Sequence, residues 1–153
     1  MRPQHDLARA YQLSQKGKHE QAERLCRRLL RQYPGDAPAT HLLGLINGNA
    51  GNDRDAERFM RKSLQLDSRV AEFHSNLANL LRRNGRFEEA VTAYRNSLKL
   101  DAAGKPAAIG LIRALAELGR YEDAEVEARL LTKRLPLDPE AWSALAMTVR
   151  DQG

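Results

Sequence analysis

The chain has 153 residues, a formal net charge of +5 and a single cysteine, Cys26. One cysteine cannot form an internal disulfide, and no apolar run approaches the roughly 20 residues that a membrane-spanning helix needs. The first fifteen residues include Arg2, Asp6 and Arg9 and no apolar core, so the sequence predicts no signal peptide. These features favour a cytoplasmic protein, and the excess of positive charge would suit an acidic partner.

A glycine recurs every 34 residues along the chain. The recurring glycines are Gly17, Gly51, Gly85, Gly119 and Gly153. An alanine stands five residues after each of the first four, at Ala22, Ala56, Ala90 and Ala124. A fixed period of this length is typical of stacked structural repeats. Each glycine is expected to take a positive φ, which ends one helix and lets the chain reverse.

Each repeat is predicted to be a pair of antiparallel helices. Apolar residues at i, i+3, i+4 and i+7 on both sides of the turn glycine give each predicted helix one apolar stripe. The repeats run approximately over 3–36, 37–70, 71–104 and 105–138, and a partial repeat covers 139–153. We therefore expect four full hairpins and one additional helix.

Individual positions within the repeats carry further structural predictions. Cys26 occupies a packing position and is expected to be a buried small apolar residue rather than a reactive thiol. Gly44 is expected where two helices approach most closely. Pro38 and Pro106 are expected in the first turns of helices, where the missing N–H costs little. In the partial repeat the pattern assigns four residues to apolar positions, namely Trp142, Leu145, Ala146 and Val149.

The third repeat resembles the tetratricopeptide repeat. The matching residues are Leu77, Ala78, Leu81, Gly85, Phe87, Ala90, Tyr94 and Ser97. His74 is unusual at its position, although the pattern places it on the apolar stripe of its helix, and Ala102 stands where that family has proline. The repeat is also similar to those in the helical arm of O-linked N-acetylglucosamine transferases. The resemblance implies an all-α, right-handed superhelical solenoid of antiparallel helix hairpins, forming a single domain over 1–153.

The resemblance also implies a concave groove lined by the first helix of each repeat. The residues that we assign to a peptide-binding groove are Tyr11, His41, Leu45, Asn76, Asn79, Arg82, Arg83 and Arg113. An asparagine amide offers a donor and an acceptor to a peptide backbone. Arginine binds carboxylate or phosphate through paired hydrogen bonds. The alternative for the asparagines and arginines is an ordinary solvated helix face.

Other classes of function find little support in the sequence. His5, His19, His41 and His74 lack metal-ligand spacing, and no nucleophile–base pair is evident. The glycines serve as turn residues rather than as a phosphate-binding loop. The basic residues do not form runs with interleaved aromatics, which argues against nucleic-acid binding. We therefore expect no catalytic, metal or cofactor site.

The sequence thus predicts a scaffold that binds a peptide segment or partner protein in the groove. One alternative is that it is the N-terminal targeting arm of a larger enzyme truncated at Gly153, of the glycosyltransferase, sulfotransferase or oxygenase type. A second alternative is a self-associating structural module, in which the terminal helix from Pro139 to Gln152 stacks on another copy. The partner itself cannot be named from the sequence.

Overall fold

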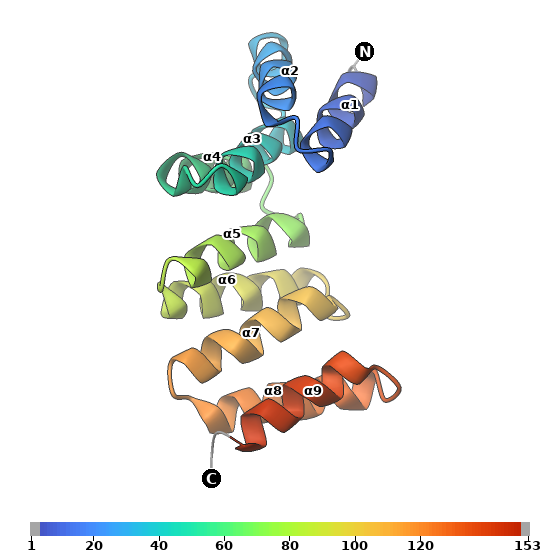
Figure 1. Ribbon diagram of the computed structural model, residues 1–153, viewed down its shortest axis with the longest axis vertical. Helices are drawn as coiled ribbons and strands as arrows, with labels where there is room; N and C mark the ends of the chain where they lie inside the picture. The colour runs from blue at the N-terminus through green and yellow to red at the C-terminus, as the bar shows by residue number, and fades with distance from the viewer. Residues whose placement is uncertain (1–3, 151–153) are drawn as a thin grey trace. The chain divides into compact units, whose positions relative to one another are not determined.

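The computed structural model describes residues 4–150, and all of the regular structure in that range is α-helical (Figure 1). The helices are α1 (Gln4–Gln15), α2 (His19–Gln32), α3 (Ala37–Asn49), α4 (Asp53–Leu66), α5 (Ala71–Arg83), α6 (Phe87–Leu100), α7 (Lys105–Glu117), α8 (Tyr121–Arg134) and α9 (Pro139–Arg150). These are the helices of the four predicted hairpins and the additional helix, so the predicted all-α repeat architecture is confirmed.

The chain divides into two compact units, Met1–Arg69 and Val70–Gly153. The first unit contains the hairpins α1–α2 and α3–α4, and the second contains α5–α6 and α7–α8 together with α9. The division falls within one residue of the predicted junction between the second and third repeats. The single continuous domain over 1–153 stays a prediction.

The hairpins turn at the predicted glycines. Gly17, Gly51, Gly85 and Gly119 have φ between 70° and 80°, a conformation that L side chains rarely adopt. At the third turn the Arg86 N–H reaches back to the Leu81 carbonyl over 2.9 Å, and the other three turns repeat this six-residue closure. Such closure satisfies carbonyls left open at the end of a helix. Gly153 lies outside the described residues.

The core of the first unit forms between its two hairpins. Its buried members are Ala10, Ala22, Cys26, Leu42, Leu43 and Ile46. The predicted burial of Cys26 is confirmed, and desolvation together with Glu23 and Asp36 raises the pKa of its thiol to about 12. The close approach at Gly44 is also confirmed, because a Cβ there would lie 2.8 Å from the Met60 Cγ.

The second unit buries its first helix on a face slightly different from the predicted one. The pattern placed His74 on the apolar stripe of α5, but the structure buries Phe73 and leaves His74 only half-buried. Leu77 and Leu81 lie in the core as expected. Burying the phenyl ring removes more apolar surface from water than burying an imidazole, and this favours the observed rotation.

Within the described residues, α9 packs against α7 and α8 only. Its buried residues are Ala141, Ala144 and Thr148. Trp142 and Val149, predicted as apolar packing positions, are 52% and 49% exposed. The equivalent positions of α1, α3, α5 and α7 are buried or half-buried.

A charged cluster connects the start of α7 to the start of α9. The Lys105 ammonium lies 2.9 Å from both the Asp138 and the Glu140 carboxylates. Asp138 also accepts the backbone N–H groups of Glu140 and Ala141, which satisfies donors in the first turn of α9. These contacts raise the pKa of Lys105 and lower the pKa of Asp138.

Candidate functional site

The first helices of successive hairpins in the second unit border an open hollow of about 330 Å³. Arg82 enters it from α5, Arg113 from α7 and Met147 from α9. The remaining lining residues are Ala116, Glu117 and Tyr121. Two guanidinium groups from different helices therefore line the same recess, together with an aromatic ring and a thioether.

A second hollow of about 450 Å³ adjoins the first. The two share Arg113 and Met147, so together they form an elongated recess along α7 and α9. The other residues that line the second hollow are Ile109, Glu140, Ser143, Ala144, Ala146 and Arg150. Glu140 already forms an ion pair with Lys105, so the recess keeps an excess of positive charge.

Behind Arg82 lies a buried tyrosine that is fixed by a hydrogen bond. Tyr94 is fully buried, and its hydroxyl donates to the Asn79 Oδ1 over 2.5 Å. Burial raises the pKa of Tyr94, and the nearby cations Arg82 and Arg113 oppose that rise. The tyrosine therefore stays protonated and acts as a neutral support for α5 beside the recess.

The Arg82 Nε is buried and has no hydrogen-bond partner within the described residues. A buried donor without an acceptor costs roughly 1–3 kcal/mol, and more for a charged group. The Arg82 side chain, which lines the recess, therefore has hydrogen-bonding capacity that the described residues do not meet.

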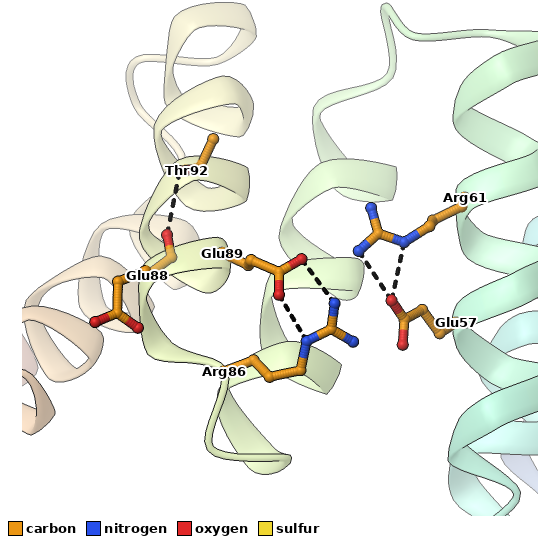
Figure 2. Close-up of polar contacts among 6 residues, drawn as sticks. All are labelled: Glu57, Arg61, Arg86, Glu88, Glu89 and Thr92. Carbon is orange, nitrogen blue, oxygen red and sulfur yellow. Dashed lines mark hydrogen bonds and ion pairs between the residues drawn. The ribbon is translucent and has the colours of Figure 1, made fainter.

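Many other arginines of the chain already have carboxylate partners. Figure 2 shows two such pairs: Arg86 contacts both carboxylate oxygens of Glu89 at 2.7 Å, and Arg61 approaches Glu57 at 2.8 Å. In contrast, neither Arg82 nor Arg113 forms an ion pair within residues 4–150. Their charge is therefore not offset by an ion pair and can attract a ligand.

The structure brings together only some of the predicted groove residues. Arg82 and Arg113 share one hollow, and Asn79 supports Tyr94 beside it. Asn76 is half-buried on α5 and Arg83 is exposed at its end, and neither lines the two hollows. Because its Oδ1 already accepts from Tyr94, Asn79 can offer a ligand chiefly its amide N–H groups.

The predicted residues of the first unit behave differently. Tyr11 and Leu45 are half-buried and pack against the core cluster of that unit. The prediction for His41 is wrong, because its side chain is fully buried and cannot line a groove. Its Nδ1 lies 3.3 Å from the Ser63 Oγ on α4, and burial lowers its pKa to about 4.

Sequence reasoning did not assign the aromatic residue Tyr121 to the recess. Tyr121 stands two residues after the turn glycine Gly119, where the repeat pattern assigns an aromatic to packing. The structure leaves it half-buried, with part of its surface in the wall beside Arg113. The pattern that predicts packing at this position carries no information on the surface that remains exposed.

The described residues offer little for metal or membrane chemistry. Within residues 4–150 no group of three or more His, Cys, Asp or Glu side chains could hold a metal ion. In the same part of the chain, none of the helices has the length and apolar character required to cross a bilayer.

Two sequence models of the tetratricopeptide repeat match the chain, over residues 81–147 and 5–36. Together with the stacked helical hairpins, these matches show that the chain belongs to the tetratricopeptide repeat family. Its fold is an all-α solenoid of such repeats, and this family generally provides scaffolds for protein interaction.

Several known proteins are similar to the chain. A probable biofilm formation methyltransferase, WspC, of Pseudomonas aeruginosa is 36% identical over 73 residues, which are 48% of this chain and 17% of that protein. The solved O-GlcNAc transferase of Thermobaculum terrenum is 30% identical with a TM-score of 0.75, covering 84% of this chain and 25% of that one. The structure of YrrB, described as a tetratricopeptide repeat protein with an unusual peptide-binding site, is 17% identical with a TM-score of 0.81 and covers 96% of this chain and 76% of its own.

Proposed function

We propose that the chain is a non-catalytic interaction module that holds an extended, acidic segment of a partner protein in the recess along α5, α7 and α9. Arg82 and Arg113 would bind a carboxylate of that segment. The observation that carries the proposal is the presence of these two arginines in one hollow, without carboxylate partners and with a buried, unsatisfied Nε–H on Arg82.

The geometry favours a carboxylate over a neutral group. An arginine can present two parallel N–H groups to a carboxylate, and charge-assisted hydrogen bonds are about twice as strong as neutral ones. The recess also contains Glu117, which would disfavour a highly charged anion such as a phosphate cluster. A single carboxylate on a peptide satisfies the arginines without bringing excess negative charge near Glu117.

Apolar and amide groups would hold the rest of the segment. Met147 has a flexible thioether side chain that adapts to different partners, and Tyr121 offers an amphipathic ring. Asn79 and Asn76 on α5 would contact the peptide backbone. Arg83 would attract the acidic segment from the exposed end of α5. Within the first unit by itself, Tyr11 and Leu45 are proposed to offer apolar contacts to a partner.

A second candidate function is that of a targeting arm within a larger enzyme. The chain spans 17% of WspC and 25% of the Thermobaculum O-GlcNAc transferase chain, and both relatives are named as transferases. In that case the recess would select the partner or substrate of a catalytic domain elsewhere in the protein. The intact mass of the protein purified from its source cells tests this candidate: a mass near 17.2 kDa would exclude it.

Self-association is a third candidate, favoured by the outward side of α9. Trp142 and Val149 are half-exposed there, and the Trp142 Nε1 donates to the Pro136 carbonyl over 2.8 Å, which holds the ring in place. Sedimentation of the chain at increasing concentration tests this candidate. We place the module in the cytoplasm, where the buried Cys26 would remain a thiol.

The main proposal is tested with fluorescein-labelled peptides of Gly, Ser and Ala that carry a central pair of glutamates. Fluorescence anisotropy would show binding to the chain, and peptides with glutamines in place of the glutamates would bind at least about tenfold more weakly. Arg113→Glu, alone or combined with Asn76→Ala, would weaken binding of the acidic peptides to a similar degree.

The control variant is Arg54→Glu, which introduces the same change of charge at an exposed position of α4. It should leave the affinity unchanged apart from a small effect of net charge. If the acidic and amide peptides bind equally, or if Arg113→Glu and Arg54→Glu weaken binding equally, the recess does not recognise carboxylates and the proposal fails.

A further inference from the structure

A third hollow of about 260 Å³ lies on the opposite side of α7, between the second helices of the last two full hairpins. Within the described residues α6 and α8 each pack against α7 but not against each other. Figure 1 shows α7 between them. The floor of the hollow is formed by Ala108 and Leu111 of α7, both buried.

The walls of this outer hollow are apolar. Leu98 contributes from α6, and Leu130 and Leu131 contribute from α8. Leu130 is 44% exposed, and Val126, one turn earlier on the same side of α8, is 58% exposed. Leu130 thus borders an apolar recess, and Val126 extends the exposed apolar surface beside it on α8. This is the composition of an anchor site for an inserted side chain.

The rim of the outer hollow is basic. Arg95 and Lys99 lie one turn apart on α6, and Arg134 stands at the end of α8. Glu127 is the one carboxylate among the residues that line the hollow. Arg134 donates to the Ala102 carbonyl in the α6–α7 connection and so holds the end of the hollow in place. Arg95 and Lys99 form no ion pair within residues 4–150, so their charge is available to a ligand.

The size of the hollow indicates what would enter it. Pockets for small-molecule ligands and cofactors occupy about 300–1,000 Å³ and enclose most of the ligand. This one is smaller, and its roof is open. It suits an apolar side chain that projects from a polypeptide, with the polypeptide lying across the rim where Arg95 and Lys99 stand.

We propose that the outer hollow is a second binding site, for a partner segment in which an apolar side chain is flanked by acidic residues. The apolar side chain enters between Leu98 and Leu130 and rests on Leu111. The flanking carboxylates pair with Arg95 and Lys99. None of the residues that line this hollow lines the recess of α5, α7 and α9, so the site is independent of the proposed function.

An anionic membrane surface is the competing occupant, because apolar and basic side chains together also bind lipid headgroups. The arrangement disfavours it. The floor is recessed between two helices, whereas a surface that lies on a bilayer presents its apolar side chains on a protruding helix face. A recess with a basic rim is complementary to a protruding side chain that has acidic neighbours.

The test is a titration of the ¹⁵N-labelled chain with a Gly-Ser peptide that contains the sequence Glu-Leu-Glu-Glu. Binding is monitored by the chemical shifts of the backbone amides. The chain carries Arg113→Glu, which disables the recess of the proposed function. The expected result is saturable shifts at the amides of α6 and α8 around Lys99 and Leu130. Peptides with Ala in place of Leu, or with Gln in place of Glu, should bind at least about fivefold more weakly.

Two variants connect these shifts to the proposed contacts. Arg95→Glu with Lys99→Glu changes exposed side chains and should weaken binding about tenfold or more. Arg54→Glu with Lys62→Glu on α4 is the charge-matched control and should have little effect. Because every chain in this test carries Arg113→Glu, the shifts report on the outer hollow and not on the recess of the proposed function. A failure of the proposed function would therefore leave these shifts unchanged.

Three outcomes would overturn the proposal. The first is the absence of saturable shifts at α6 and α8 at millimolar peptide. The second is equal binding of the Leu and Ala peptides, which would show that the apolar floor is not used. The third is that the peptide gives no shifts while the chain cosediments with phosphatidylserine vesicles and not with phosphatidylcholine vesicles. If Arg95→Glu with Lys99→Glu also abolishes that cosedimentation, the hollow is assigned to a membrane.

Discussion

The ring of Tyr94 occupies the space in which a side chain at Gly110 would begin. A Cβ built on Gly110 would lie 2.3 Å from the Cζ of Tyr94 and 2.6 Å from its hydroxyl oxygen. The same hydroxyl is held by Asn79, so the tyrosine cannot easily move away. Because Gly110 has no side chain, α7 leaves room for the buried ring of Tyr94, which supports α5 beside the candidate site.

Gly110→Ala should destabilise the second unit. Alanine gains about 1 kcal/mol in helix propensity over glycine. The overlap with the tyrosine ring is deeper than a shift of a few tenths of an ångström can relieve, and overpacking of this kind costs about 1–3 kcal/mol or more. We expect a net loss of about 1–2 kcal/mol in the free energy of unfolding, measured by urea denaturation.

Two controls define the cause of that loss. Gly35→Ala changes an exposed glycine with no atom within 4 Å of the added Cβ, and it should be close to neutral. Adding Tyr94→Leu to Gly110→Ala gives the new methyl group room, so its effect should be smaller than the sum of the two single changes. Strict additivity would show that the ring and the glycine do not interact.

The burial of His41 predicts a pH-dependent stability of the first unit. Its pKa is about 4 in the folded chain, against an ordinary value of 6.5. The unfolded chain therefore binds more protons between these values, so stability is complete above pH 6.5 and is lost as the pH falls towards 4. The pKa difference corresponds to about 3 kcal/mol.

Urea denaturation of the chain and of His41→Gln, measured between pH 4 and pH 7, checks this prediction. The variant lacks the titrating imidazole, so its stability should fall less steeply with acid than that of the parent chain. His5→Gln changes an exposed histidine on α1 and serves as the control. Parallel pH profiles for the parent and His41→Gln would contradict the assignment.

The ion pairs of Lys105 predict which segment opens first when they are removed. Lys105→Met retains the aliphatic stem but removes the ammonium that contacts Asp138 and Glu140. Amide hydrogen exchange in α9 should accelerate, while exchange in α5 stays unchanged. Lys133→Met, an exposed change on α8, is the control, and equal exchange in both variants would show that the cluster does not hold α9.

The pKa shifts of the same cluster give its pH window. The pKa of Lys105 is raised, so its contribution is present below the ordinary value of 10.5 and is lost as the pH rises through the folded value. The pKa of Asp138 is lowered, so its contribution is present above 3.8 and is lost as the pH falls through the folded value. Protection of α9 should therefore be greatest between these limits.

The architecture follows from local patterns in the sequence. The 34-residue spacing of Gly17, Gly51, Gly85 and Gly119 predicts turns because a positive φ is a property of one residue, and the structure has that conformation at all four positions. Pro38 and Pro106 likewise lie in the first turns of α3 and α7 as predicted, since proline lacks the N–H that an interior position requires.

The details that the sequence did not predict depend on pairs of residues from different helices. His41 stands at a groove position by repeat number, but its ring lies beneath the surface, 3.3 Å from the Oγ of Ser63 on α4. The pairing of Gly110 with Tyr94 is of the same kind, because neither residue alone indicates the other. The outer hollow depends on the separation of α6 from α8, which no repeat position encodes.

The coupling between Arg113 and the carboxylate of a bound peptide tests the central claim most directly. Anisotropy gives the affinities of the parent chain and of Arg113→Ala for a glutamate peptide and for its glutamine counterpart. A direct contact predicts that the two changes are not additive, with a coupling of about 1 kcal/mol or more. Additive effects within about 0.3 kcal/mol would show that Arg113 does not contact the carboxylate, and would contradict a carboxylate-binding recess along α5, α7 and α9.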